Sequence, residues 1–467
     1  MHSGGSLSGD SRITRLIDTS DAKTNMRWVW TLGLGGIFFE AYSSTALASG
    51  LGPLTKVLNL TPENIALLTS LSMGLAIVLC PLAGTLSDRC GRLTVILAAK
   101  AIAFFSGIIA VTAVNYEMLV ISRVLAGIAW SMDFGVVIAY LAELVPTQLQ
   151  HRLNRWQGMW YVATTTNLLI SAGIYELGAG SSVWRYSLAS AAAFAFVLFF
   201  LQLWKLPESP KWLASRGRHA EAERAVRRVY HVAEPIPEKY ESHTLAKPET
   251  VGIVEGLKEL FGPQYRARTI LAAIPGMMQA CQYFAIGWYL PVIALLLFGK
   301  GYLTATLGTV FFNIFGIIGG FASTPLSKWL RMRRSMQYGF GGSVLILLFF
   351  GYNFGHMTLA LSVAIPSLFI LWHSGLAASG FMSLGAMAFP SRLRGLGMGV
   401  TTMANNMGAA IGLFVFPLLQ AKFGAGEAIM ITATIPLIGF FTTSLIRWDP
   451  ERAALDAVQN QRVATDV

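Results

Sequence analysis

Three ionisable residues lie deep inside long apolar stretches of this sequence, where an unpaired charge is costly. Glu40 stands about 12 residues into the first stretch, roughly 18 Å from its start if that stretch is a helix. Arg123 and Asp133 both lie in the fourth stretch. A carboxyl group in such a place can take up and release a proton, and an arginine beside it favours the charged form. We predict that Glu40, Arg123 and Asp133 carry proton coupling, with Glu40 paired to Arg123; a purely structural ion pair is the alternative.

Amide and aromatic side chains interrupt the apolar stretches, mainly in the second half of the chain, which has almost no charge inside them. Such groups suit a hydrogen-bonding, ring-bearing or polyol solute. For each of them, a hydrogen bond between helices is the alternative explanation. The predicted cavity residues are Tyr42, Asn167, Gln279, Gln282, Tyr283, Asn313, Trp372, His373 and Asn405.

A third group of charged residues and glycines stands where apolar stretches end. Asp88 can cap a helix start while neighbouring arginines reach acids on other helices, and Gly91 permits a tight turn. We predict that this group closes one side of the molecule. Its members are Gly84, Asp88, Arg89, Gly91, Arg92, Glu143, Arg152, Glu208, Arg392 and Arg394. Lys100 is expected to extend its charge to the nearer membrane surface.

The elements that position these residues follow from composition. The chain has 467 residues, of which 54% are hydrophobic and only 13% charged. A water-soluble domain carries about 25% charged residues, so the solvent for this chain is lipid. Stretches long enough to span a bilayer are expected at 28–51, 63–86, 93–113, 117–145, 157–180, 184–205, 268–297, 303–327, 335–355, 357–388, 395–421 and 425–447.

Basic residues predict the orientation of these twelve spans. With both termini inside, the outer loops hold four of the 35 lysines and arginines and the spans hold two, which leaves 29 on the inner side. We therefore expect an all-α membrane protein of two six-helix bundles. Its parts are a cytosolic tail at 1–27, a bundle at 28–205, a cytosolic loop with short helices at 206–267, a bundle at 268–447 and a cytosolic tail at 448–467.

Several function classes are not favoured by the sequence. The three cysteines form no metal-ligand spacing, and no cofactor motif or nucleophile–base pattern indicates an enzyme. The net charge of +11 follows from the inner loops and does not indicate nucleic acid. The expected partners are a small-molecule solute, protons and the lipid bilayer of a cell membrane, with the protein acting as a monomer.

The segment Gly84-x-x-x-Asp88-Arg89-x-Gly91-Arg92 resembles the cytoplasmic loop motif of the major facilitator superfamily. Arg123-Val-Leu-Ala-Gly127 resembles its fourth-helix motif, and the segment from Pro207 to Leu213 resembles the signature after the sixth helix of the sugar-porter branch. The resemblance implies a transporter fold with the solute bound between the two halves. In sugar-porter relatives, an acid and an arginine at the positions of Glu40 and Arg123 are associated with proton coupling.

The sequence also departs from its relatives. Ser43 stands where aromatic-acid and metabolite symporters often carry a second acid, and Lys328 replaces the loop Asp in the second half. Only Gln279, Gln282 and Tyr283 remain of the seventh-helix pattern of sugar porters. We expect a proton-coupled carrier of a sugar, organic acid or aromatic, nicotinate-like metabolite. A uniporter, an exporter or a non-transporting sensor are the alternatives.

Overall fold

The computed structural model describes Ile13, Ile17 and residues 26–144, 156–230, 252–299, 301–381, 384–385, 388–389 and 391–449. Every regular element within these ranges is a helix. In the first half the elements are α2 (Met26–Leu58), α3 (Pro62–Cys90), α4 (Arg92–Thr112), α5 (Tyr116–Leu144), α6 (Trp156–Ile174), η2 (Tyr175–Ala179), η3 (Gly180–Ser182), α7 (Val183–Lys205), α8 (Pro210–Ser215) and α9 (His219–Val229).

The second half continues in the same way. Its elements are α10 (Ile253–Leu260), α11 (Arg266–Gln282), η4 (Tyr283–Gly287), α12 (Leu290–Phe298), α13 (Gly301–Leu330), α14 (Met332–Asn353), η5 (Phe354–His356), α15 (Leu359–Trp372), η6 (His373–Ala377), α17 (Ser391–Phe423), α18 (Ala425–Thr432) and α19 (Thr434–Leu445). An all-helical fold is what lipid requires, because every backbone group must find its hydrogen bond inside the chain.

Ten helices or helix runs in the described ranges are long and apolar enough to cross a membrane, judged by length and composition. One of these runs, Trp156–Lys205, has 50 residues and is interrupted where Gly178 takes a φ of 95°. Large apolar side chains point away from the protein along the spans; Val78 is 66% exposed and Leu345 is 70% exposed. Such a surface fits acyl chains and not water.

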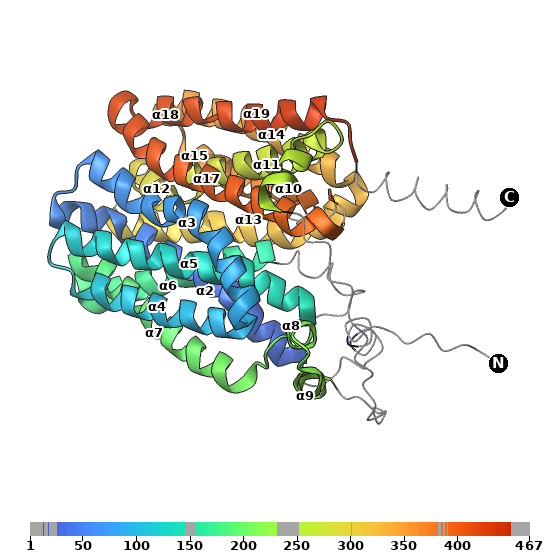
Figure 1. Ribbon diagram of the computed structural model, residues 1–467. Coiled ribbons are helices and arrows are strands. Elements are labelled where there is room, and N and C mark those ends of the chain that lie inside the picture. The colour runs from blue at the N-terminus through green and yellow to red at the C-terminus, as the bar shows by residue number, and fades with distance from the viewer. Residues whose placement is uncertain are drawn as a thin grey trace, which may run out of the picture.

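The helices of each half pack mainly against one another. In Figure 1, α2 to α7 gather in the lower part of the view and most second-half helices in the upper part. Two helix pairs, α3 with α17 and α6 with α13, form the main contacts between the halves. The backbones of α6 and α13 lie close together, since a Cβ added at Gly320 would be only 2.8 Å from the backbone of Gly158. Small residues thus let the two halves meet without side chains between their backbones.

Two π-helical segments interrupt the second half, at η4 and η6. Such segments are rare, and they are frequent at functional sites because they turn side chains out of regular register. Tyr283 begins the first and His373 begins the second, and the two rings stack with their centroids 5.5 Å apart. Both residues belong to the cavity described below.

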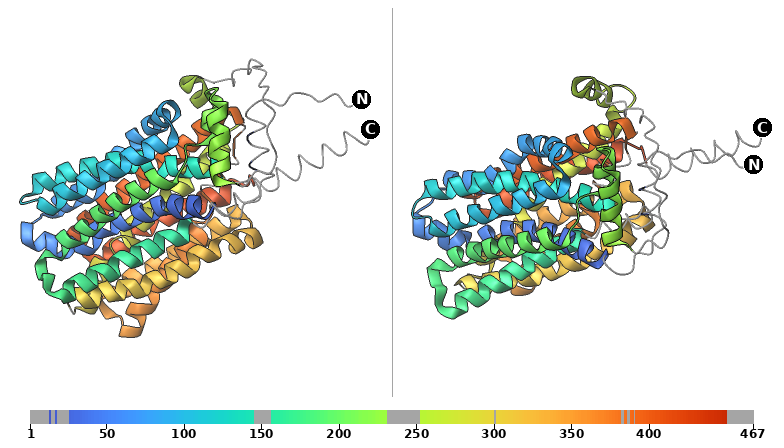
Figure 2. Two further views of the ribbon diagram at one scale, coloured as in Figure 1. Left: turned by 90° about the horizontal axis from the view of Figure 1, so that it is seen from below. Right: turned by 60° about the horizontal axis from the view of Figure 1, so that its bottom comes forward.

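The region between the halves contains the short helices α8, α9 and α10. One of them, α9, lies with α8 at one end of the long helices (Figures 1 and 2). Arg218 pairs with Glu221 at 2.7 Å, and this hydrogen bonding lowers the pKa of Glu221 below its usual range. On α10, just before α11, Leu260 is buried and Val254 is exposed.

Some predictions fall outside the described residues. Arg152 lies in the undescribed segment 145–155, and most residues of the two predicted tails are also outside the described ranges. Arg392 and Arg394 belong to α17, but their side chains are not described.

Candidate functional site

A cavity of about 470 Å³ lies between the two halves of the protein. Seven of its lining residues carry an aromatic ring other than imidazole; these are Trp130, Phe134, Trp156, Trp160, Tyr283, Phe284 and Phe381. Its polar lining residues are Gln157, Gln279, His373, Asn405 and Asn406. We call this space the amide cavity. Flat apolar faces combined with a few amides suit a ring that also makes hydrogen bonds.

Hydrogen bonds across the wall hold this lining in place. Gln279 Nε2 donates to Asn405 Oδ1 at 2.7 Å, and Trp160 Nε1 donates to the Tyr283 hydroxyl at 2.7 Å. The second of these bonds joins the first half of the chain to the second. Two buried polar atoms are left without a hydrogen-bond partner among the described residues, the Gln157 Oε1 acceptor and His373 Nε2. Polar atoms of this kind can be satisfied by a bound solute or by water.

A second cavity of about 440 Å³ shares Met73 and Trp130 with the first. Its remaining walls combine polar and apolar residues, and they come from α2, α3 and α5 together with Trp288 and Leu413. They include Glu40, Ser43, Ser44, Thr69, Ser72 and Arg123. We call this space the arginine cavity.

Behind the arginine cavity, Glu40 belongs to a buried charge cluster. Lys100 Nζ on α4 lies 3.6 Å from Glu40 Oε1 and forms a close ion pair and hydrogen bond with Asp133 Oδ2. The Lys100 side chain is fully buried and also lies over the Phe39 ring, 4.5 Å from its centroid. The other Asp133 oxygen has no hydrogen-bond partner among the described residues.

This cluster corrects two predictions. Lys100 does not extend to the membrane surface, because Asp133 on the neighbouring helix α5 holds its ammonium group inside the bundle. The ion-pair partner of Glu40 is Lys100 and not Arg123. Arg123 lines the same cavity as Glu40, yet no hydrogen bond or ion pair joins its guanidinium group to the residues described.

The predicted cavity residues divide into two groups. Gln279, Tyr283, His373 and Asn405 line the amide cavity together. The others lie outside both cavities and make hydrogen bonds within the helix packing; these are Tyr42 with Ser190, Asn167 with Ser187, Gln282 with His373, Asn313 with Thr164, and Trp372 with the Tyr338 carbonyl.

The first-half wall of the amide cavity was not predicted. Trp156, Gln157 and Trp160 all come from α6. A signal was present in the sequence, because Trp156 and Trp160 stand four residues apart and therefore share one face of a helix. Trp130 and Phe134 have the same spacing on α5, and their rings are stacked with centroids 5.3 Å apart.

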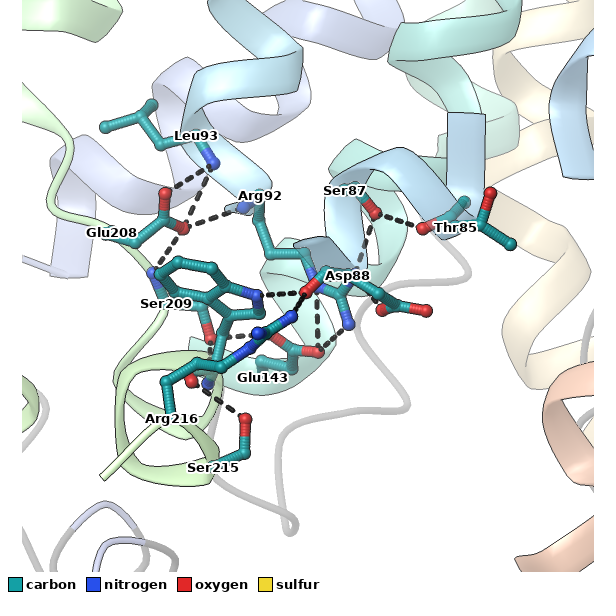
Figure 3. A network of polar contacts seen from close by, with 12 residues as sticks. Thr85, Ser87, Asp88, Arg92, Leu93, Glu143, Glu208, Ser209, Ser215 and Arg216 are labelled. Atoms are coloured by element: carbon teal, nitrogen blue, oxygen red, sulfur yellow. Dashed lines mark hydrogen bonds and ion pairs between the residues drawn. The ribbon is translucent and has the colours of Figure 1, made fainter. Parts of the chain in front are cut away.

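The predicted charge network forms around Arg92, as Figure 3 shows. Its guanidinium group pairs with Asp88 and, at 3.2 Å, with Glu143. Ser209 donates a hydrogen bond to the same Glu143 carboxylate, and Trp212 donates to the Asp88 carbonyl at 2.7 Å. These contacts fasten α8 to the ends of α3, α4 and α5.

Glu208 caps the start of α4. Its carboxylate accepts hydrogen bonds from the backbone N–H groups of Arg92 at 2.9 Å and Leu93 at 3.1 Å (Figure 3). A carboxylate here accepts hydrogen bonds from backbone amides that have no partner within the helix, and its negative charge interacts favourably with the positive end of the helix dipole. Gly91 takes a φ of 106°, and a Cβ at this position would lie 2.4 Å from Glu208. In contrast, nothing lies within 4 Å of a Cβ at Gly84.

All of these contacts join parts of the first half. Arg89 is exposed, and its side chain makes no hydrogen bond or ion pair with the described residues, so its part in the network remains a prediction. The part that Arg152, Arg392 and Arg394 play in closure remains a prediction.

Comparisons with known proteins agree with this architecture. The family described as Major Facilitator Superfamily matches residues 33–413. The chain is 29% identical to the inner membrane metabolite transport protein YgcS of Escherichia coli over 441 residues, which cover 91% of this chain and 92% of that protein. It is 25% identical to the arabinose-proton symporter of Bacillus subtilis over 454 residues, covering 91% and 92%.

A solved structure has the same fold. The partially occluded inward-open form of the xylose transporter XylE from E. coli superimposes with a TM-score of 0.72 at 16% sequence identity, covering 91% of this chain and all of that one.

Proposed function

Because the chain belongs to the major facilitator superfamily, we propose that it is a membrane transporter that carries a small polar organic solute together with a proton. One observation carries the proton coupling. Glu40 borders a cavity and contacts a buried lysine that Asp133 also holds. The protonation state of a carboxyl group placed in this way depends both on the solute in the cavity and on the charges of the cluster.

The proposed topology has twelve spans in two six-helix bundles, at 28–205 and 268–447. The ten candidate spans become twelve when the run Trp156–Lys205 is divided at its break and the 33-residue helix α2 is added. Because basic residues favour the cytosolic side, both termini and the 206–267 region face the cytosol. The protein works as a monomer in the cell membrane.

The cluster supports a simple cycle. Lys100 carries one positive charge between two carboxyl groups, and it lies closer to Asp133 than to Glu40. Glu40 can therefore accept a proton while the Lys100–Asp133 pair stays intact. Loading a proton removes a negative charge from the arginine cavity, and release of that proton on the inner side returns the cluster to its first state.

The remaining site residues receive roles that fit their positions. Gln279, Tyr283, His373 and Asn405 contact the solute in the amide cavity. The Arg92 network holds α8 against the first bundle and contributes to closure of the cytosolic side. The arabinose-proton symporter similarity supports proton coupling, because that relative is matched over nearly its full length.

Uptake into proteoliposomes tests this function. The purified protein is reconstituted and offered radiolabelled xylose, arabinose, myo-inositol, glucuronate, benzoate and nicotinate, with and without an imposed inward proton gradient. We expect accumulation of at least one solute, stimulated by the gradient and lost when a protonophore is added. Gradient-independent equilibration without accumulation would replace symport by uniport.

A further inference from the structure

The arginine cavity contains a buried cation with no partner in the described protein. The residue Arg123 is 8% exposed, and its guanidinium group lines the cavity without a hydrogen bond or ion pair to a described side chain. An arginine out of bulk water requires an anion, and its planar donors match a carboxylate through two parallel hydrogen bonds. Glu40 does not supply that anion, since its ion-pair partner is Lys100.

The walls around Arg123 add hydroxyl groups. Ser43, Ser44 and Thr69 line the same cavity, and Ser44 and Thr69 also bond across to Trp288 and Tyr289. Hydroxyl donors beside a guanidinium group form a setting for an oxyanion. Ser43 matters most here, because a carboxylate at this position would share the cavity with Arg123 and neutralise it.

The adjoining cavity indicates what the anion is attached to. Arg123 and Trp130 stand seven residues apart on α5, which is two helical turns and about 10 Å along one face. Trp130 belongs to both cavities, and beyond it lie the aromatic rings and amides of the amide cavity. A molecule held by Arg123 at one end can therefore place a ring among these groups.

We propose that the solute is a ring-bearing monocarboxylate whose carboxylate binds Arg123 in the arginine cavity and whose ring lies in the amide cavity. This proposal rests on the proposed transport function and specifies its substrate class. An aromatic acid and a sugar acid share this chemistry, and the experiment distinguishes them.

The same geometry explains coupling. The bound carboxylate would share the arginine cavity with Glu40, and two negative charges in one cavity repel each other. The groups facing Glu40 are Lys100, Asp133 and Arg123, which carry two positive charges and one negative charge in their ionised forms. Entry of an anion therefore favours a proton on Glu40, so that solute and proton bind together.

Binding to the purified full-length protein tests the substrate class without any proton gradient. Isothermal titration compares nicotinate with nicotinamide, and glucuronate with glucose. We expect one carboxylate of these pairs to bind at least about tenfold more tightly than its neutral counterpart. Preference for nicotinate identifies an aromatic acid, and preference for glucuronate identifies a sugar acid. Equal binding within both pairs, or no binding of either carboxylate, overturns the proposal.

Variants of two cavity residues make the test specific. Arg123→Gln should weaken carboxylate binding about 10- to 100-fold, the range expected for a charge-assisted hydrogen bond. Because this variant can fail to fold, Ser43→Asp provides a second test, with Ser43→Asn as its uncharged control. The aspartate should reduce carboxylate binding at least about tenfold while the asparagine does not; equal effects of both overturn the proposal.

These experiments distinguish failure of the proposed proton symport from failure of the proposed substrate class. If carboxylates bind through Arg123 but accumulation ignores the proton gradient, proton symport is wrong and the substrate class stands. If a neutral sugar accumulates with the gradient and no carboxylate binds, the substrate class is wrong and symport stands.

Discussion

Lys100 Nζ lies 3.6 Å from Glu40 Oε1, inside the first bundle and out of contact with water. The same ammonium group pairs closely with Asp133, so one lysine is shared by two acids. The contact with Glu40 is the longer of the two, and of the three residues it is Glu40 that lines the arginine cavity. The side chain best placed to change its charge is therefore the one that borders the cavity in which we propose that the solute binds.

The first prediction concerns stability. Lys100→Met leaves two buried carboxyl groups without their counter-ion, and breaking a buried pair in this way costs about 3–5 kcal/mol. Unfolding of the detergent-purified protein measures the loss. Lys56→Met, at an exposed lysine near the end of α2, should change stability by less than about 0.5 kcal/mol. The double variant Lys100→Met/Asp133→Leu should recover most of the lost stability. If Lys100→Met and Lys56→Met are equally stable, the cluster has no structural role.

The second prediction concerns coupling. Glu40→Gln keeps the shape of the side chain but cannot carry a proton in and out. We expect it to abolish proton-driven accumulation in proteoliposomes and to leave solute exchange at equal concentrations largely intact. Glu63→Gln removes an exposed acid at the start of α3 and should leave both modes unchanged. Full gradient-driven accumulation by the Glu40 variant would assign the proton to another residue, with Asp133 next in line.

Helix positions were easier to predict from the sequence than the contacts made by the site residues. Apolar length alone predicted a span at 63–86, and α3 runs from Pro62 to Cys90, because polar residues past the bilayer continue a helix that has already formed. The predicted span 184–205 agrees closely with α7, Val183–Lys205. The expected span 157–180 is less regular than predicted, because α6 ends at Ile174 and a π-helical turn follows.

Partners across helices were harder to predict. The position of Lys100 along its own helix predicts that its ammonium group reaches the membrane surface. This prediction is wrong because α4 turns Lys100 toward Asp133 on α5, and the rotation of one helix relative to another cannot be read from the sequence. Glu40 was recognised as costly inside a membrane, but its partner was misassigned for the same reason. Motif residues fared better, since Asp88, Arg92 and Glu143 do come together.

The third prediction separates two glycines of one motif. Gly91→Ala combines an unfavourable positive φ with a Cβ 2.4 Å from Glu208, so we expect a loss of about 1–3 kcal/mol and a displaced cap on α4. Gly84→Ala meets no atom within 4 Å and should be neutral or stabilising by about 0.5–1 kcal/mol. Thermal unfolding of the two variants side by side checks this order. A reversed order would show that the Gly91 turn adapts without strain.

The last prediction concerns the contacts that join the halves near one end. Across the halves, the Tyr289 hydroxyl lies 3.0 Å from Thr69 Oγ1, and Trp288 Nε1 donates to Ser44 Oγ at 2.9 Å. Within the second half, the Tyr289 hydroxyl donates to the Leu413 carbonyl at 2.9 Å. In the proposed topology these bonds lie in the outer half of the membrane and hold that side closed.

Removing them should favour the outward-open state. Each net hydrogen bond contributes about 0.5–1.5 kcal/mol, so Tyr289→Phe with Ser44→Ala should shift the inward-to-outward ratio by roughly tenfold. Spin labels at Glu63 and Lys422, exposed at the outer ends of α3 and α17, report the distance between the halves in a cysteine-free background. Tyr338→Phe, at an exposed tyrosine on α14, is the matched control and should leave that distance unchanged. If the double variant gives the same distance distribution as the control, these bonds do not set the conformational balance, and closure of the outer side must depend on the apolar packing around them.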